Sequence, residues 1–142
     1  MCWTRWKDIY QESGYNGCAI YMIRMKTDEG TAKIPRFLGI DEKGLLYIGT
    51  TENLETRRNQ FINGRNRGNG HIGANLLYLL NIYTRIKRQF KNYTCKYSFK
   101  KLRKGLELGE QESREIKRYV IKFGEVPPLN SAIPLRNNDA TW

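Results

Sequence analysis

The chain has 142 residues, of which 39% are hydrophobic and 27% are charged, and its formal net charge at neutral pH is +11. This length and apolar content predict a single domain over residues 1–142 with one modest core. No apolar run approaches the roughly 18 to 20 residues of a bilayer-spanning helix, and no secretory signal opens the chain, so we expect a cytoplasmic protein without a membrane partner.

The N-terminal part predicts one short helix and two strands. Residues 5–12 favour a short helix before a turn at 13–17, and the β-forming residues 18–25 predict a strand. Residues 27–44 carry charges, glycines and a proline, which indicates a loop or a ragged hairpin arm. Residues 45–49 predict a second strand, which Gly49 ends.

The C-terminal part predicts three helices and one more strand. Capping side chains before Leu54 favour a helix, and three glycines then predict an irregular loop at 63–70. Apolar steps of three and four predict an amphipathic helix over residues 72–89, whose apolar face carries Leu76, Leu77, Leu80, Tyr83 and Ile86. An alternating strand at 93–99 and a last helix at 106–123 follow. We therefore expect an α+β fold: a small, mainly antiparallel, three-stranded sheet flanked by helices.

The positive charge is concentrated in the middle of the chain. Residues 56–106 contain thirteen Lys and Arg side chains and no acid, and aromatic residues are interleaved with them. A merely solvated face normally carries both signs, so this pattern predicts a polyanionic partner such as nucleic acid. A binding module without catalysis would share this charge, so charge alone does not identify an enzyme.

Cysteine and histidine usage excludes several kinds of site. Cys2, Cys18 and Cys95 are odd in number and widely spaced, which predicts reduced thiols. The single histidine, His71, excludes two-histidine zinc fingers and the two-histidine helix of metalloproteases.

Two short strings at the predicted strands carry a resemblance to a known family. Ala19-Ile20-Tyr21 and Tyr47-Ile48-Gly49 precede Arg57, a glutamate on the last helix and a Pro-Pro-Leu-Asn string at 127–130. In this order the chain resembles the GIY-YIG nuclease family over residues 17–130. Ala19 stands where the family has glycine, and the spacing between the two tyrosine strings suggests an insertion at about residues 26–43.

The resemblance implies a metal-dependent DNA endonuclease that hydrolyses phosphodiester bonds. It implies Glu112 as the ligand of a Mg2+ (or Mn2+) ion, with Glu115 as the rival one turn on. One carboxylate with waters and phosphate oxygens is a chemically adequate set of ligands for magnesium. Arg57 would grip the phosphate with a charge that persists at every working pH.

The remaining expected site residues are Tyr21, Tyr47, His71 and Asn130. The resemblance makes Tyr21 the expected proton acceptor and Tyr47 a group that orients water or substrate; both could instead be core residues. His71 could lie near the scissile phosphate or be an ordinary surface histidine. Asn130 would brace the site by hydrogen bonds, or could simply form a turn after the prolines.

Target selection is expected from basic residues outside the catalytic set, or from a homodimer or a partner protein. The expected DNA contacts are Arg58, Arg65, Arg67, Arg85, Lys87 and Arg88. The alternative interpretation is a basic nucleic-acid-binding module that has the same scaffold without catalysis.

Overall fold

The computed structural model describes residues 2–83, 85–90 and 92–132 and is built on three long antiparallel strands. Strand β2 (Ala19–Thr27) is central, and it pairs with β6 (Leu45–Thr51) on one side and β7 (Thr94–Lys101) on the other. Two short strands, β1 (Lys7–Asp8) on β7 and β3 (Gly30–Thr31) on β2, extend this sheet to five strands. The predicted antiparallel sheet is confirmed, with these two additions.

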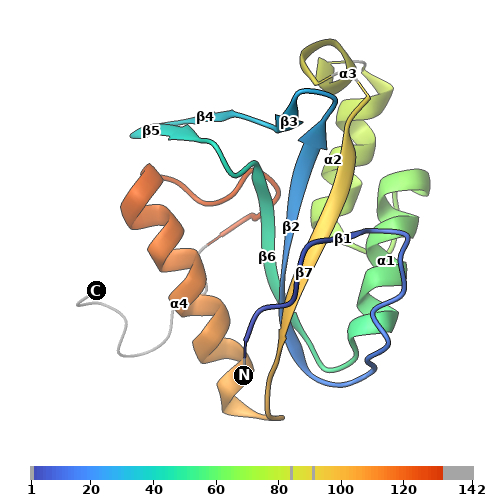
Figure 1. The fold of residues 1–142 in the computed structure, drawn as a ribbon, viewed down its shortest axis with the longest axis vertical. Helices are drawn as coiled ribbons and strands as arrows, with labels where there is room; N and C mark the ends of the chain where they lie inside the picture. The colour runs from blue at the N-terminus through green and yellow to red at the C-terminus, as the bar shows by residue number, and fades with distance from the viewer. Residues whose placement is uncertain (1, 84, 91, 133–142) are drawn as a thin grey trace.

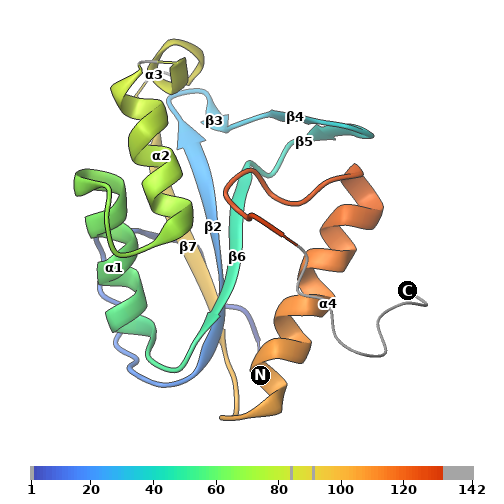
Figure 2. The same cartoon turned by 180° about the vertical axis from the view of Figure 1, so that it is seen from behind.

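Helices cover both faces of the sheet (Figure 1, Figure 2). Helices α1 (Leu54–Arg67) and α2 (Ile72–Ile82) lie on one face, and α4 (Leu106–Phe123) lies on the other. The short helix α3 (Arg85–Gln89) follows α2 at the end of the molecule where β7 begins. The mixture of helices with an antiparallel sheet is the predicted α+β class.

The central strand β2 contributes to two separate apolar clusters. Tyr21, Ile23 and Met25 belong to the cluster under α1 and α2, whereas Ile20 packs with Ile116 of α4. Successive side chains of a strand point to opposite faces, which explains this division. The expectation of one core is therefore wrong: the sheet separates two clusters.

The predicted helix at residues 5–12 is also wrong. This segment runs alongside β7, where the Ile9 N–H donates to the Cys95 carbonyl at 3.0 Å and the Thr4 N–H donates to that of Phe99 at 2.9 Å. An edge strand has unpaired backbone groups, and pairing with them outweighs a weak local helix preference.

The glycine-rich segment 63–70 is mostly helical rather than a loop. Helix α1 continues to Arg67 and ends at Gly68, which adopts φ 79°. A Cβ on Gly64 would lie 2.7 Å from the Cβ of Ala74, so this glycine permits close packing of α1 against α2. Packing between the helices therefore explains a glycine that the sequence suggested was a helix breaker.

The predicted helix at 72–89 is divided into α2 and α3, and its inward face differs from the expected one. Leu77 and Ile86 are buried as predicted, but Leu76 and Tyr83 are exposed. The large apolar side chains on the outer face of this region are Ile72, Leu76, Leu79, Ile82 and Tyr83. Periodicity alone did not identify the inward side because apolar residues surround most of α2.

The segment expected as an insertion forms a projecting hairpin arm, β4 (Ile34–Arg36) and β5 (Gly39–Asp41). The arm is tied to α4: the Leu38 N–H donates to the Phe123 carbonyl at 2.9 Å, and the Tyr119 hydroxyl donates to the buried Asp41 carboxylate at 2.8 Å. The arm is visible beyond the end of α4 in Figure 2.

The outer edge of β6 is covered by the segment after α4. The Asn130 side chain accepts from the Ile48 N–H at 3.0 Å and donates to the Ile48 carbonyl at 2.9 Å, and the Leu129 N–H donates to the Leu46 carbonyl. Asn130 thus completes the hydrogen bonding of an edge strand.

Candidate active site

A cavity of about 220 Å³ lies at the edge of β6, and we call it the site pocket. Four of the six expected catalytic residues line it: Tyr47, Arg57, Glu112 and Asn130. They come from β6, α1, α4 and the segment after α4, so residues from both faces of the sheet meet around its edge. The other lining residues are Ile72, Gly73, Leu129, Ser131 and Ala132.

Arg57 is held on the second turn of α1 by three acceptors. Its Nε donates to the Tyr21 hydroxyl at 3.3 Å, and its Nη1 donates to Gln60 Oε1 at 2.8 Å and the Gly70 carbonyl at 3.5 Å. Burial lowers the pKa of Arg57, but Tyr21 and Tyr47 outweigh this effect and raise it overall. The guanidinium is therefore a permanent cation at the pocket wall.

Tyr21 and His71 lie one layer behind the pocket, with exposed fractions of 4% and 2%. His71 is the N-cap of α2, and its Nδ1 accepts the Ala74 N–H at 3.3 Å. A neutral imidazole that accepts at Nδ1 carries its proton on Nε2, so Nε2 donates to the Tyr21 hydroxyl oxygen at 3.1 Å. His71 is neither a surface group nor a pocket group: it supports Tyr21.

Burial fixes the protonation of these inner residues. It lowers the pKa of His71 to about 3, and the Arg57 charge acts in the same direction. Burial and Tyr47 raise the pKa of Tyr21 above its ordinary value, and Arg57 only partly opposes them. At neutral pH the imidazole and the inner phenol are both uncharged.

Tyr47 is the phenol that faces the pocket. Its ring is half-buried and lies 5.9 Å from the Tyr21 ring and 4.8 Å from the His71 ring, measured between centroids. Burial raises the pKa of Tyr47, Arg57 lowers it, and Glu112 raises it. Interaction with the Tyr21 hydroxyl lowers the pKa of Tyr47, whereas the same contact raises that of Tyr21.

Glu112 is the carboxylate of the site pocket, and its rival is placed elsewhere. Glu112 Oε2 accepts from the Thr50 hydroxyl at 2.9 Å, which ties α4 to β6 beside the pocket. Glu115 instead forms an ion pair with Arg118 at 3.1 Å and is not a lining residue. Of these two glutamates, Glu112 is therefore the one that lines the site pocket.

The residues present fit a divalent ion held mainly by water and substrate. In residues 2–83, 85–90 and 92–132, no three His, Cys, Asp or Glu side chains are grouped as a metal cage. Magnesium commonly uses one or two carboxylates and keeps several waters, which a single glutamate in a pocket with a cationic wall allows. Glu112 is the side chain that would hold the ion.

Gly49 allows the two tyrosines to approach each other. A Cβ there would lie 2.6 Å from a Tyr47 ring carbon and 2.9 Å from the Tyr21 hydroxyl. We expect Gly49→Ala to displace both rings and, in the phosphodiester cleavage that the family resemblance implies, to reduce the rate by about 10²-fold, because a shift near 1 Å is enough to misplace a reacting group. Circular dichroism should show a retained fold, and cleavage at the wild-type rate would contradict the prediction.

Because His71 is the only histidine, its pKa should be visible in protein stability. The unfolded chain takes up a proton below about pH 6.5, whereas the folded protein resists it down to about pH 3. The free energy of unfolding should therefore fall by up to about 1.4 kcal/mol per pH unit in this window.

Urea unfolding at pH 7.5 and pH 5 measures this loss, and His71→Asn is the control because asparagine keeps the N-cap acceptor. We expect the variant to lose less than half as much stability as the wild type between these two values. This pH range stops at pH 5, above the pH values at which protonation of carboxylates begins to lower the stability. One such carboxylate is Glu55, whose pKa is lowered to about 2. Equal losses in the two proteins would contradict the assignment of His71 as a buried neutral cap.

The expected DNA contacts divide into different groups. The Arg58 side chain is only 7% exposed, pairs with Glu55 at 2.7 Å and donates to the Ile9 carbonyl at 2.8 Å. Its expected role as a DNA contact is therefore wrong, because its guanidinium serves the fold. Arg65 donates to the Tyr10 hydroxyl at 2.9 Å, while Arg67 is exposed at the end of α1.

Arg88 is exposed on α3 and lines a groove that also contains Asp28 and Glu29. The side chains of Arg85 and Lys87 lie outside the described residues, so their expected contacts are not placed.

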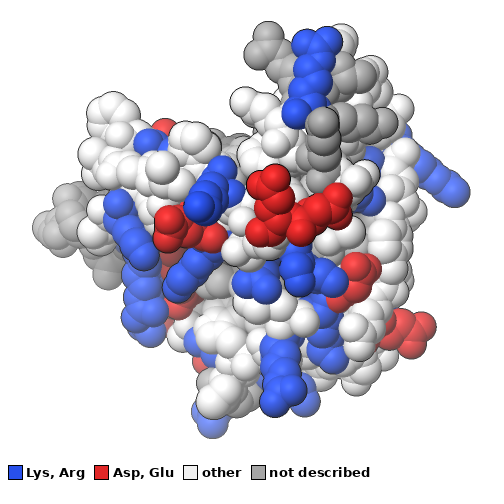
Figure 3. All heavy atoms as spheres, turned by 45° about the horizontal axis from the view of Figure 1, so that its top comes forward, with Lys and Arg blue, Asp and Glu red and all other residues white. Residues whose placement is uncertain are grey.

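The acid-free middle of the sequence does not become an acid-free surface. Figure 3 shows acidic side chains between basic ones on the face that it presents. The ends of the chain fold back onto the middle: Asp8 lies 3.5 Å from Lys96, and Asp28 accepts from Asn92 at 2.9 Å. Folding therefore intersperses charges that the sequence keeps apart.

Two supporting residues were missed at the sequence level. Thr50 holds the Glu112 carboxylate, and Gln60 holds Arg57. Gln60 follows Arg57 by three positions, which places the two side chains on one helix face, so its role was recoverable. The contact of Thr50 joins residues 62 positions apart, and no local pattern indicates it.

In comparisons with known proteins, no family model, no curated protein and no solved structure matches the chain. Every helix within the described ranges is too short or too polar to cross a bilayer. The assignment of function therefore depends on the residues and their geometry.

Proposed function

We propose that this protein is a metal-dependent DNA endonuclease that hydrolyses phosphodiester bonds in the site pocket. One observation carries the proposal: a guanidinium, a phenol and a carboxylate from three separate elements line one open cavity. The order of the two tyrosine strings, Arg57, Glu112 and Asn130 along the chain resembles that of the GIY-YIG nucleases and supports the same function.

Arg57 and Glu112 have complementary tasks in the proposed reaction. Arg57 binds phosphate oxygens and stabilises the charge that develops on them during attack. Glu112, oriented by Thr50, holds a Mg2+ or Mn2+ ion together with waters and phosphate oxygens. When bound, such an ion supplies charge neutralisation and lowers the pKa of a water molecule.

The geometry favours Tyr47 over Tyr21 as the proton acceptor, which revises the expectation from the sequence. Tyr47 lines the pocket, whereas Tyr21 is buried behind it. The Tyr21 hydroxyl receives N–H donors from Arg57 and His71 and in turn lowers the pKa of Tyr47. We assign Tyr47 the direct role and treat Tyr21 and His71 as positioning residues.

The proposed hydrolysis needs no reactant besides the DNA and water. The water oxygen forms a bond to phosphorus, the bond from phosphorus to the leaving oxygen breaks, and a proton passes from water to the Tyr47 phenolate. The leaving oxygen takes its proton from solvent. Asn130 holds the β6 edge that carries Tyr47, through its two hydrogen bonds to Ile48.

We extend the proposal to the compartment in which the protein works and to its partners. The three cysteines are free thiols, which a reducing cytoplasm preserves. A homodimer or a partner protein could supply the target selection that the small site does not.

Incubation of supercoiled plasmid with the purified protein tests the proposal. We expect nicked and linear products with Mg2+ or Mn2+, and none with EDTA. A gel-shift assay in EDTA should show that binding persists. Binding without cleavage under all metal conditions would favour the alternative, a nucleic-acid-binding module without catalysis.

A further inference from the structure

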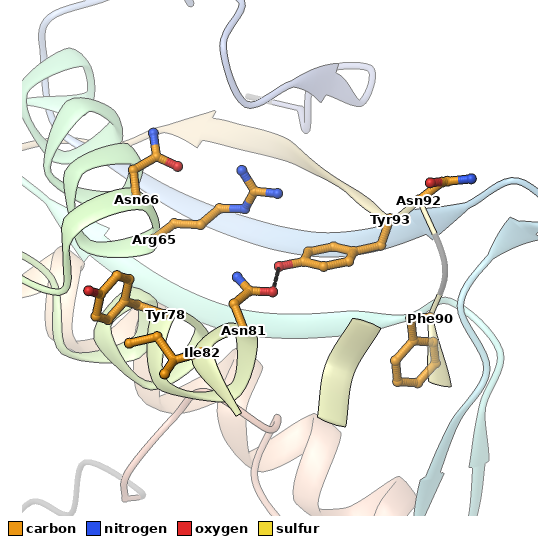
Figure 4. Close-up of a pocket in the computed structure, with 8 residues that line it drawn as sticks. All are labelled: Arg65, Asn66, Tyr78, Asn81, Ile82, Phe90, Asn92 and Tyr93. Carbon is orange, nitrogen blue, oxygen red and sulfur yellow. Dashed lines mark hydrogen bonds between the residues drawn. The ribbon is translucent and has the colours of Figure 1, made fainter. Parts of the chain in front are cut away.

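A second and larger cavity, of about 670 Å³, lies at the other end of α2 from the site pocket. We call it the amide pocket, and Figure 4 shows the side chains that line it. They are Arg65, Asn66, Tyr78, Asn81, Ile82, Phe90, Asn92 and Tyr93. Its volume is within the range of pockets that hold small organic ligands.

Aromatic rings give this pocket flat apolar walls. Tyr78 and Phe90 stand at opposite sides, with Tyr93 between them (Figure 4), and all three rings are only partly buried. The Tyr93 hydroxyl donates to Asn81 Oδ1 at 2.7 Å, and the Arg65 guanidinium lies 5.2 Å from the Tyr93 ring centroid. These contacts fix Tyr93 while they leave the Tyr78 and Phe90 faces partly exposed. Partly exposed rings are typical platforms for stacking.

Three asparagines add hydrogen-bonding groups of both kinds. Asn81 and Asn66 accept through their carbonyl oxygens from Tyr93 and Tyr10, so their amide N–H groups are left as donors. Asn92 donates to Asp28, so its carbonyl oxygen is left as an acceptor. In the part of the chain that the structure describes, these remaining groups have no protein partner.

Flat walls together with amide donors and acceptors match the chemistry of a nucleobase. A base has two faces for stacking and an edge that carries donors and acceptors, and asparagine is a common partner of that edge. Among the described residues that line the pocket there is no acidic side chain, and Arg65 provides a cation for an attached phosphate. Asp28 is nearby, but it is engaged with Asn92 at the rim.

The distance between the two pockets suits one nucleic-acid strand. Gly73 lines the site pocket and Asn81 lines the amide pocket, and eight residues of α-helix separate them by about 12 Å. At about 3.4 Å per nucleotide in B-form DNA, this corresponds to roughly four nucleotides. A strand cleaved at one end of α2 can therefore reach the other end.

We infer that the amide pocket binds one unpaired nucleobase of the DNA strand whose phosphate occupies the site pocket. The inference rests on the proposed function for the source of the base, because a free nucleotide presents the same chemistry. Base capture would give this small protein a preference for substrates with an unstacked nucleotide close to the cut.

The test measures fluorescence anisotropy of the full chain in EDTA with two labelled 12-nucleotide probes. One is single-stranded DNA, and the other is abasic and keeps only the sugars and phosphates. The wild type should bind the base-containing probe at least about tenfold more tightly, since stacking contributes about 1–3 kcal/mol per base. Tyr78→Leu/Phe90→Leu should bind both probes equally.

Two controls separate stacking from a general loss of structure. Tyr78→Phe keeps the ring and should retain the tenfold preference, and so should Tyr83→Leu, which removes a ring at the C-cap of α2 that is 73% exposed and outside the pocket. Retention of the preference by the double variant would overturn the inference. Saturation by dAMP that the oligonucleotide does not displace would assign the site to free nucleotides and overturn the link to DNA.

Plasmid cleavage with Mg2+ distinguishes this inference from the proposed function. Cleavage by the double variant together with a lost base preference would support both. Base preference in a wild-type protein that never cleaves would support the pocket and remove the endonuclease proposal. Normal cleavage with no base preference in the wild type would remove the pocket alone.

Discussion

Replacement of Glu112 by glutamine is expected to reduce plasmid cleavage by about 10³-fold or more. The substitution keeps the shape and an acceptor for the Thr50 hydroxyl but removes the negative charge that would hold the metal ion. Loss of a positioned divalent ion removes several kcal/mol of transition-state stabilisation. Single-turnover cleavage with Mg2+ measures the effect, and a gel shift in EDTA should show unchanged DNA binding.

Glu115→Gln is the matched control for this prediction. It removes the same charge one turn away, where Glu115 pairs with Arg118 at the surface of α4. We expect cleavage close to that of the wild type, because Glu115 does not line the site pocket and its partner Arg118 has a side chain that is 68% exposed. A reversed result, with Glu115→Gln inactive and Glu112→Gln active, would show that the metal ligand is misassigned.

Tyr47→Phe is expected to slow cleavage by about 10²- to 10⁴-fold, the usual contribution of a positioned general base. The substitution removes only the hydroxyl and leaves the ring packed beside Tyr21 and His71. Burial raises the pKa of Tyr47, so its phenolate is a minor species at neutral pH. The wild-type rate should therefore rise about tenfold per pH unit between pH 6 and 9, and the residual activity of Tyr47→Phe should not.

Tyr21→Phe and His71→Asn provide the comparison. Both remove groups behind the pocket wall, so each should reduce the rate less than Tyr47→Phe does. The wild-type profile should show no inflection near pH 6.5, because the pKa of His71 is lowered to about 3. A larger loss for Tyr21→Phe than for Tyr47→Phe would return the role of proton acceptor to Tyr21.

The elements that meet at the site were largely predictable because their local signals are strong. The helix from residue 106 to 123 was predicted with the observed bounds, since its apolar spacing is regular and Gly124 ends it. The capping residue Asn53 and the spacing after it placed Arg57 on a helix. These elements bring four of the six expected catalytic residues to the site pocket.

Which site residues line the pocket and which lie buried behind it could not be predicted, because this depends on contacts between residues far apart in the chain. His71 looked like a surface loop residue because its burial depends on contacts with Tyr21 and Tyr47, which come from strands far away in the sequence. The order of the two phenols, with Tyr21 behind Tyr47, depends on how α1 and α2 cover the sheet. The amide pocket is lined by residues of α1, of α2 and of the segment between α3 and β7, and no sequence motif indicates it.

The distribution of charge on the surface also depends on contacts between residues far apart in the chain. The acid-free stretch at residues 56–106 predicted a polyanionic partner, but within it Arg58 is held by Glu55 and the Ile9 carbonyl, and Lys96 lies 3.5 Å from Asp8. A local count of charges cannot anticipate which of them fold against each other. The net charge of +11 nevertheless favours association with a polyanion.

Cleavage of a labelled DNA in water enriched in oxygen-18 tests the central claim most directly. If water attacks phosphorus in the site pocket, the terminal phosphate of the product carries one oxygen-18 atom and the protein remains unmodified. Cleavage products without the isotope, a tyrosine covalently joined to DNA, or intact DNA in the presence of Mg2+ and Mn2+ would contradict it.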